Sequence, residues 1–464
     1  MEIKEYLNQN LSNMTEDIKT LMRIDSTKGE AKEGMPYGEG PAKALAEAEK
    51  IAKAMGFKVK NYANHVITID MNDKETQLDI LAHLDVVPAG DGWTVTTPFE
   101  PVVVDNKLYG RGSMDDKGPA MASLYAMKAI RDLNIPVSKN VRLILGADEE
   151  CGSGDLKYYY SIEKEAPMSV SPDANFPVIN IEKGSLSGKV TARFKDEKLS
   201  SGIYRIWGGE KTNVIPGKAF AEVYGISKSQ IEEVCQAESK ATGLEYKVEE
   251  KEHFILISVF GKTGHAASPA SASNAVTGII SLISKLPLEE GEGFKSVKSL
   301  SKLFPHGDWR GVAAGVSQED EISGILTICL DIIEFGNGYL AGTFDSRCPI
   351  CANEDNMRKV LEKSCEKLGL KLEAGKMNEP HYVPADSMLV KELLACYEEA
   401  TGQKGEAIAI GGGTYVHHIE NGVAFGPEMP GVDYRIHGPN EFAGLDDLLL
   451  CAEVYAKAIE KLCK

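Results

Sequence analysis

Two short apolar runs in the first third of the chain end directly in charged side chains. Leu78–Ala82 leads into His83-Leu-Asp85, and Val141–Ala147 leads into Asp148-Glu-Glu150. Helical segments separate such strand-like runs, and strands that alternate with helices imply an α/β sheet covered on both faces. Reactive groups in these sheets gather beyond the carboxyl ends of the strands. The sequence therefore predicts an α/β fold with a site at one end of its sheet.

The pattern of predicted helices and strands changes twice along the chain, which predicts two domains. Up to about residue 184 we expect helices over 1–24, 41–55 and 119–133, a strand over 66–69, and a hairpin of 102–104 with 107–109. Between 185 and 380 strand-like pieces alternate with helices such as 227–241 and 275–286, as in βαβ-like units. The α/β pattern of the first part returns after about residue 381, with a helix near 386–401. We predict a catalytic domain of 1–184 and 381–464, interrupted by a domain of 185–380.

Composition narrows the classes of function. The chain has 464 residues and a formal net charge of −18, which argues against a nucleic-acid partner. No run approaches the roughly 20 apolar residues of a membrane helix, and the N-terminus has no apolar signal-peptide core. Nine scattered cysteines are typical of reduced thiols. We expect a cytoplasmic enzyme for small substrates, with no membrane association.

Five potential metal ligands lie in separate polar clusters, each next to an apolar segment or a Gly/Pro turn. Imidazole and carboxylate together suit zinc, manganese or cobalt. Two divalent ions bring four positive charges, and three carboxylates with one hydroxide balance them. Without metal, converging carboxylates would repel one another. The sequence predicts a two-metal site whose ligands are His83, Asp115, Glu150, Asp173 and His437.

Two further carboxylates have predicted roles beside this site. Glu149 precedes Glu150, and adjacent side chains point in different directions, so Glu149 is free to face a metal-activated hydroxide as the general base. Asp85 lies two residues after His83. A carboxylate that accepts a hydrogen bond from a ligand imidazole fixes its tautomer, and we assign this orienting role to Asp85.

Five motifs occur in order along the chain: His83-Leu-Asp85-Val-Val-Pro, Gly110-Arg-Gly-Ser-Met-Asp115-Asp116, Asp148-Glu149-Glu150-Cys-Gly, Ser171-Pro-Asp173-Ala and His437-Gly-Pro-Asn-Glu441. Together they resemble the ArgE/DapE/aminoacylase/carboxypeptidase family of co-catalytic zinc peptidases. Three further segments are Pro172-Asp-Ala-Asn-Phe-Pro177, Thr212-Asn-Val-Ile-Pro216 and Gly411-Gly-Gly-Thr-Tyr415. These segments look most like the PepV-type dipeptidases of that family, and the resemblance covers essentially the whole chain.

The resemblance implies how the ligands divide between two metal ions, with zinc expected and manganese or cobalt as alternatives. His83 and Asp173 would bind one ion, and Glu150 and His437 the other. Asp115 would bridge both ions, with a cis peptide bond to Asp116. The implied fold is a zinc-peptidase-like catalytic domain, with a mixed sheet between helices, interrupted by an α+β lid domain.

The lid is expected to bind substrate. There, the resemblance implies that His265 polarises the scissile carbonyl and steadies its oxyanion. Asn213 and Arg347 would grip the substrate, with Arg347 binding the carboxylate in a bidentate manner. The backbone of Gly412 and Gly413, in the catalytic domain, would approach the same carboxylate. A monomer is expected, with a dimer as the alternative.

Three functions remain open from the sequence. The first is a two-metal dipeptidase for unblocked dipeptides, including β-Ala-His or Xaa-His types. The second is a deacylase of N-acyl amino acids with the same metal site, and the third is a peptide-binding protein that kept the fold without the reaction. His417, His418 and the Cys348/Cys351 pair have no assigned role.

Overall fold

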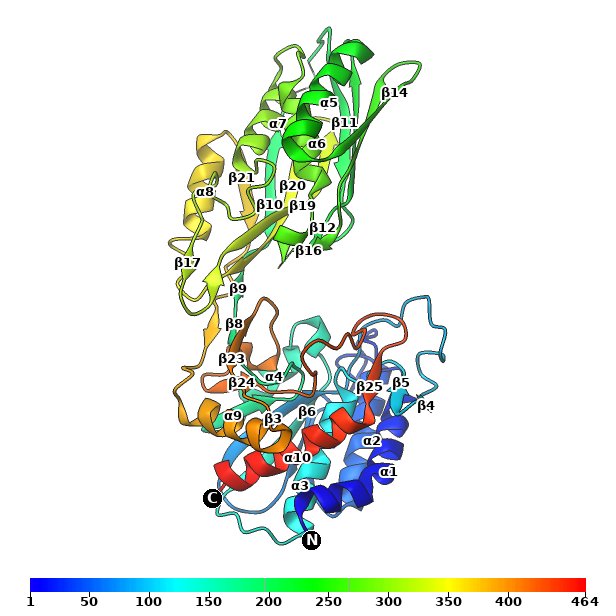
Figure 1. Ribbon diagram of the computed structural model, residues 1–464, viewed down its shortest axis with the longest axis vertical. Coiled ribbons are helices and arrows are strands. Elements are labelled where there is room, and N and C mark those ends of the chain that lie inside the picture. The colour runs from blue at the N-terminus through cyan, green and yellow to red at the C-terminus, as the bar shows by residue number, and fades with distance from the viewer. Residues whose placement is uncertain (196, 267) are drawn as a thin grey trace. The chain divides into compact units, whose positions relative to one another are not determined.

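The computed structural model describes residues 1–195, 197–266 and 268–464. The chain forms two compact units, one of Met1–Glu182 with Tyr382–Lys464 and the other of Lys183–His381 (Figure 1). Within the described residues, no helix has the length and apolarity needed to cross a membrane. That the second unit is a lid for substrate stays a prediction.

The first unit is built on a mixed sheet. The pairs β3–β6, β3–β7, β7–β24 and β8–β23 are parallel, and the pairs β1–β2, β2–β6 and β8–β24 are antiparallel. The strand order is β1 (Lys58–Tyr62), β2 (Val66–Asp70), β6 (Asn140–Gly146), β3 (Thr76–His83), β7 (Met168–Ser171), β24 (Gly422–Ala424), β8 (Val178–Glu182) and β22 (His381–Tyr382), and β23 (Ala407–Ile410) also pairs with β8.

Both faces of this sheet are apolar because both are covered. Along β6, Leu143 and Leu145 join the larger core, whereas Ile144 joins a smaller core on the other face. Side chains alternate between faces along a strand, so a sheet buried on both sides needs apolar residues at consecutive positions. The larger core includes α1 (Ile3–Met22), α2 (Glu39–Ala54), α3 (Lys117–Asp132), α9 (Met388–Thr401) and α10 (Leu445–Leu462); the smaller core includes α4 (Gly154–Tyr160) and the short helix η3 (Tyr415–His418). The predicted sheet between helices is confirmed.

The predicted hairpin also forms, as β4 (Val102–Val104) and β5 (Lys107–Tyr109). Its turn residues Asp105 and Asn106 both have positive φ, at 50° and 60°. Asp and Asn tolerate this conformation better than most side chains, which suits a two-residue hairpin turn. Strand β25 (Phe442–Gly444) adds to β5 and so brings the C-terminal segment beside the hairpin.

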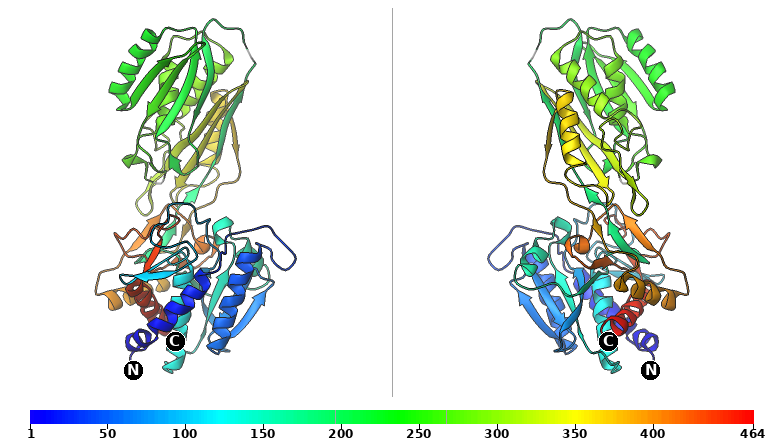
Figure 2. Two further views of the ribbon diagram at one scale, coloured as in Figure 1. Left: turned by 90° about the vertical axis from the view of Figure 1, so that its right-hand side faces the viewer. Right: turned by 90° about the vertical axis from the view of Figure 1, so that its left-hand side faces the viewer.

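The second unit contains a sheet whose strand pairs, among the described residues, are all antiparallel. Helices α5 (Lys228–Thr242), α6 (Ala275–Lys285), α7 (Glu292–Leu303) and α8 (Arg358–Lys367) contribute to its core (Figures 1 and 2). The strand order is β14 (Glu245–Glu250), β15 (Ile255–Phe260), β13 (Lys218–Tyr224), β11 (Gly202–Gly208), β19 (Thr327–Gly336), β20 (Tyr339–Cys348), β10 (Gly188–Arg193) and β21 (Lys371–Ala374), with β9 (Gly184–Ser185) beside β20.

The βαβ-like units expected here occur in split form. Strands β13 and β14 are both antiparallel to β15, so they run parallel to each other with β15 between them, and α5 connects them. Likewise β20 and β21 are both antiparallel to β10, and α8 connects them. Each half of the unit therefore has a strand–helix–strand crossover between strands that are not neighbours.

Candidate metal centre

Three neighbouring parallel strands of the first unit end at one edge of its sheet, and each leads into a predicted site residue. His83 is the last residue of β3 and is paired in register with Gly146, the last residue of β6. The turn after β6 carries Glu149 and Glu150, and the loop after β7 carries Asp173. Because β6, β3 and β7 are adjacent, side chains from three distant chain segments converge here.

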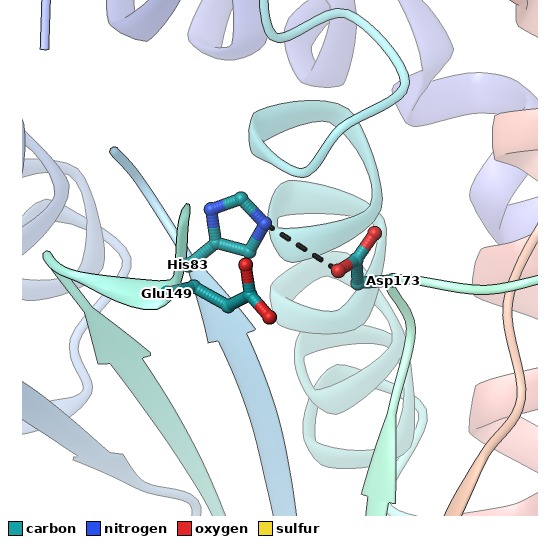
Figure 3. Close-up of side chains that lie close together, drawn as sticks. All are labelled: His83, Glu149 and Asp173. Atoms are coloured by element: carbon teal, nitrogen blue, oxygen red, sulfur yellow. Dashed lines mark ion pairs between the residues drawn. The ribbon is translucent and has the colours of Figure 1, made fainter. Parts of the chain in front are cut away.

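The imidazole of His83 is fully buried at the centre of this cluster. Its Nε2 atom lies 3.0 Å from Asp115 Oδ1 and 3.5 Å from Asp173 Oδ2. Figure 3 shows His83, Glu149 and Asp173 with their polar ends gathered together. Ligands at about 2.0–2.1 Å from a tetrahedral ion lie about 3.3 Å from one another. The spacing of these atoms therefore suits a shared metal ion.

The carboxylate of Asp115 lies between two histidines. Its Oδ2 atom is 2.9 Å from His437 Nε2, which in turn lies 3.2 Å from Glu150 Oε1. The Asp115–Asp116 peptide bond is cis, as the family resemblance implies. Within the described part of the chain, His83 Nε2 and Asp115 Oδ1 are buried and lie 3.0 Å apart, but neither atom forms a hydrogen bond of acceptable geometry. Buried polar atoms are rarely left unpaired, so these two atoms fit a role as metal ligands.

Two groups of side chains offer atoms within 4.8 Å of one another, as a metal ion requires. One is His83, Glu149 and Asp173, and the other is His83, Asp115 and Glu150. The predicted ligands are thus brought together in the first unit. The groups differ from the predicted division in that they include Glu149 and use His83 twice.

The concentration of carboxylates shifts their proton affinities. Burial, followed by the charges of Asp173, Glu150 and Asp115, raises the pKa of Glu149 well above its usual range, although His83 opposes this. Burial alone would lower the pKa of His83, but its acidic neighbours raise it well above the usual range. Bound divalent cations favour charged carboxylates and neutral imidazole. The residues present therefore fit a pair of divalent ions.

Asp85 fixes the turn that carries Glu149 and Glu150. Its two carboxylate oxygens accept hydrogen bonds from the backbone N–H groups of Glu149 and Glu150, at 3.2 and 3.1 Å. His83 Nδ1 lies 3.0 Å from the backbone oxygen of Asp85 and 3.5 Å from its carboxylate. The backbone oxygen is thus the nearer acceptor for the imidazole, and the carboxylate serves mainly the turn.

Glu441 is a residue of the site that sequence reasoning did not assign. Its fully buried carboxylate pairs with Arg111 at 2.6 Å and accepts hydrogen bonds from the backbone of Gly112, Met114 and Asp115. It therefore shapes the loop that carries Asp115. The available signal was its place in the quoted motif, four residues after His437.

Tyr415 and Asp155 form a second buried support. Asp155 Oδ2 accepts hydrogen bonds from the Tyr415 hydroxyl and from the backbone N–H groups of Ala147 and Asp148. The Tyr415 ring meets the His83 ring edge-on, with centroids 6.1 Å apart. The end of β6 and the imidazole of His83 are thereby packed against the same tyrosine.

The glycine loop is anchored by Glu182. Oε1 of this buried glutamate accepts hydrogen bonds from the backbone and hydroxyl of Thr414, and its Oε2 lies 3.0 Å from His417 Nδ1. These contacts fix the backbone directly after Gly412 and Gly413. His417, which had no predicted role, thus has a structural partner.

The remaining predicted site residues belong to the second unit. Asn213 and His265 are close together there, because β12 (Val214–Ile215) pairs with β16 (Gly264–His265) and Ala266 N donates to Asn213 O. Asn213 has a positive φ of 62°, and its N–H donates to Asp331. Arg347, on β20, lies 3.1 Å from Asp345. These three residues belong to the second unit, whereas the predicted metal ligands belong to the first.

Comparison with known proteins identifies the family. The sequence profile of Peptidase family M20/M25/M40 matches residues 80–461. The chain belongs to this family. It is 33% identical over 454 residues to "Putative dipeptidase YtjP" of Bacillus subtilis, covering 97% of this chain and 96% of that protein. It is 30% identical over 469 residues to the "Beta-Ala-Xaa dipeptidase" of Lactobacillus delbrueckii subsp. lactis, covering 100% and 99%.

A solved structure shares the M20 fold. The human carnosine dipeptidase 1 structure matches with a TM-score of 0.59 and 18% identity, over 99% of this chain and 98% of that one. At this identity the likeness supports the fold alone. The family profile makes this M20 protein a metallopeptidase and confirms the predicted family.

Proposed function

We propose that this M20 protein is a two-metal dipeptidase that hydrolyses the amide bond of unblocked dipeptides. The observation that carries the proposal is the carboxylate of Asp115, which has His83 Nε2 at 3.0 Å from one oxygen and His437 Nε2 at 2.9 Å from the other. A carboxylate held between two imidazoles has the geometry of a bridging ligand. The names of the two sequence relatives support dipeptides as the substrate class.

The proposed ligand set is His83, Asp115, Glu150, Asp173 and His437, with zinc as the proposed metal. When bound, the ions would supply a Lewis acid for the carbonyl and a more acidic water. Glu149 would accept a proton from the attacking water and pass it to the leaving amine, since its carboxylate lies among the proposed ligands. Asp85 and Glu441 would hold the loops of Glu149 and Asp115 in place.

The second unit is proposed to act as the lid that completes the site. His265 would donate a hydrogen bond to the developing oxyanion, and its pairing with the Asn213 segment keeps the two residues in a fixed relation. Arg347 would bind the carboxylate of the dipeptide, together with backbone at Gly412 and Gly413. The unit would act within a monomer.

The test is hydrolysis by the purified protein after chelation, with and without added Zn²⁺ or Mn²⁺. The substrates are a panel of free dipeptides, including β-alanyl and Xaa-His types, and matched N-acetyl amino acids. We expect metal-restored cleavage of the dipeptides, with the N-acetyl compounds left intact. Cleavage of the N-acetyl compounds alone would replace the proposal with a deacylase. Binding of dipeptides without cleavage under any metal would replace it with a peptide-binding protein.

A further inference from the structure

Glu428 is fixed against the loop that carries Asp173. Its backbone N–H donates to Ala174 O at 3.2 Å, and its carbonyl accepts from Phe176 N at 2.9 Å. Its carboxylate accepts a hydrogen bond from the side-chain amide of Asn175 at 3.0 Å. Backbone and side chain are thus both tied to residues directly after Asp173.

A close backbone approach brings this segment to the loop. A Cβ atom at Gly426 would fall 2.0 Å from Pro172 O and 2.4 Å from Ala174 O, so only glycine fits there. Glu428, two residues later, is partly buried. The position of its carboxylate is therefore fixed, unlike that of a mobile surface side chain.

Glu428 forms no ion pair with a lysine or arginine within the described ranges 1–195, 197–266 and 268–464. Its side-chain partner is the neutral amide of Asn175. Burial, and then the negative charges of Asp173 and Asp115, raise the pKa of Glu428 to about 7. The charges of these two proposed ligands therefore act on the carboxylate of Glu428. Divalent ions would balance the charge of those ligands, and Glu428, outside the ligand set, would remain a negative group beside the Asp173 loop.

We propose that the carboxylate of Glu428 binds the free ammonium group of the substrate and so makes an unblocked amino terminus a requirement of this site. The inference rests on the proposed dipeptidase function. In a dipeptide, the α-nitrogen lies about 2.5 Å from the scissile carbonyl carbon. A carbonyl held at the ligands therefore brings the ammonium close to the Asp173 loop, where Glu428 is anchored.

The same charge argues against N-acyl substrates. An ammonium group would form a charge-assisted hydrogen bond with Glu428. An acylated nitrogen carries no positive charge and would leave the charge of the partly buried carboxylate uncompensated while covering it from water. Such unpaired groups penalise binding strongly. Glu428 thus selects between the two hydrolase classes that one metal site can serve.

The experiment measures binding separately from hydrolysis. In the metal-loaded Glu149→Ala variant, calorimetry would compare alanyl-alanine with N-propionyl-alanine, which has the same shape without the amine. We expect alanyl-alanine to bind about 10-fold tighter or more. Adding Glu428→Gln removes the charge but keeps an acceptor for Asn175, and we expect the preference to fall to within about twofold.

The controls separate this inference from its alternatives. Glu30→Gln, at an exposed glutamate of the same unit, should leave the preference unchanged. Equal or undetectable binding of the two ligands by the parent variant overturns the inference. So does an equal loss for both ligands on Glu428→Gln, which would indicate only support of the Asp173 loop. Failure of the proposed function would look different: the preference would be present, but the unaltered protein would hydrolyse no dipeptide.

Discussion

The sheets of the two units bury their strands differently. In the first unit all five residues of β8 and all four of β7 are buried, whereas β13 in the second unit alternates between buried and more exposed positions. Parallel strands connected by helices are covered on both faces, and antiparallel strands can leave one face open. The predicted site residues are distributed accordingly. The proposed metal ligands lie at strand ends and loops of the first unit, whereas in the second unit Asn213 and His265 lie at the short pair β12–β16 and Arg347 lies on β20.

This comparison teaches how a precise site is supported. The turn after β6 is held by the carboxylates of Asp85 and Asp155, and the loop of Asp115 by Glu441. Ligands held from both backbone and side chain can keep a productive geometry. In the second unit, Asn213 is held through its backbone N–H, which donates to Asp331. We therefore expect chemistry to depend most on the first unit and substrate binding on the second.

The largest loss is expected at the bridge. Asp115→Asn weakens an oxygen ligand that two ions would share, and each ion contributes several kcal/mol to catalysis. We expect kcat/KM to fall about 10⁴-fold or more. Metal content by mass spectrometry should fall with it. Retention of two ions and of activity would show that the first unit does not hold the metals as proposed.

The general base should give the next largest effect. Glu149→Gln removes the proton acceptor but keeps the shape of the side chain, so we expect kcat to fall about 10²- to 10⁴-fold. The metal content should remain that of the unaltered protein. If the ions were lost instead, Glu149 would be a ligand, as its place in one of the two metal-compatible groups allows.

His265→Ala tests whether the second unit takes part in the chemistry. If His265 steadies the oxyanion, kcat should fall about 10²-fold, with KM changed little. His253→Ala, at an exposed histidine of the same unit, is the matched control. A rise in KM alone would assign His265 to substrate binding, and no change in either constant would separate the second unit from catalysis.

The smallest effect is expected from a support of the first unit. Tyr415→Phe removes one buried donor to Asp155, so the free energy of unfolding should fall by about 1–2 kcal/mol and kcat by less than about tenfold. Tyr397→Phe, which removes a hydrogen bond to Gln403 away from the ligands, is the control. Urea unfolding and kcat should be measured for both. A loss of kcat equal in the two variants would mean that Tyr415 supports the fold but not the site.

Local pattern was sufficient for much of the fold. The apolar runs that end in His83 and before Glu149 are strands β3 and β6, and the turn at Asp105 and Asn106 joins β4 to β5. Periodicity and turn chemistry depend on neighbouring residues, so a single sequence contains them. It did not contain the split crossovers of the second unit, because the inserted strands β15 and β10 come from elsewhere in the chain.

The sequence by itself determined the residue types of the centre: two imidazoles and several carboxylates, each next to a strand end or a tight turn. Only the tertiary structure decided which side chains meet. Glu441 holds the backbone of Met114 from 327 residues away, and Glu428 is held beside Asp173 by a close backbone approach at Gly426. Such contacts follow from the order of strands in the sheet and from packing between distant segments, which no local pattern encodes.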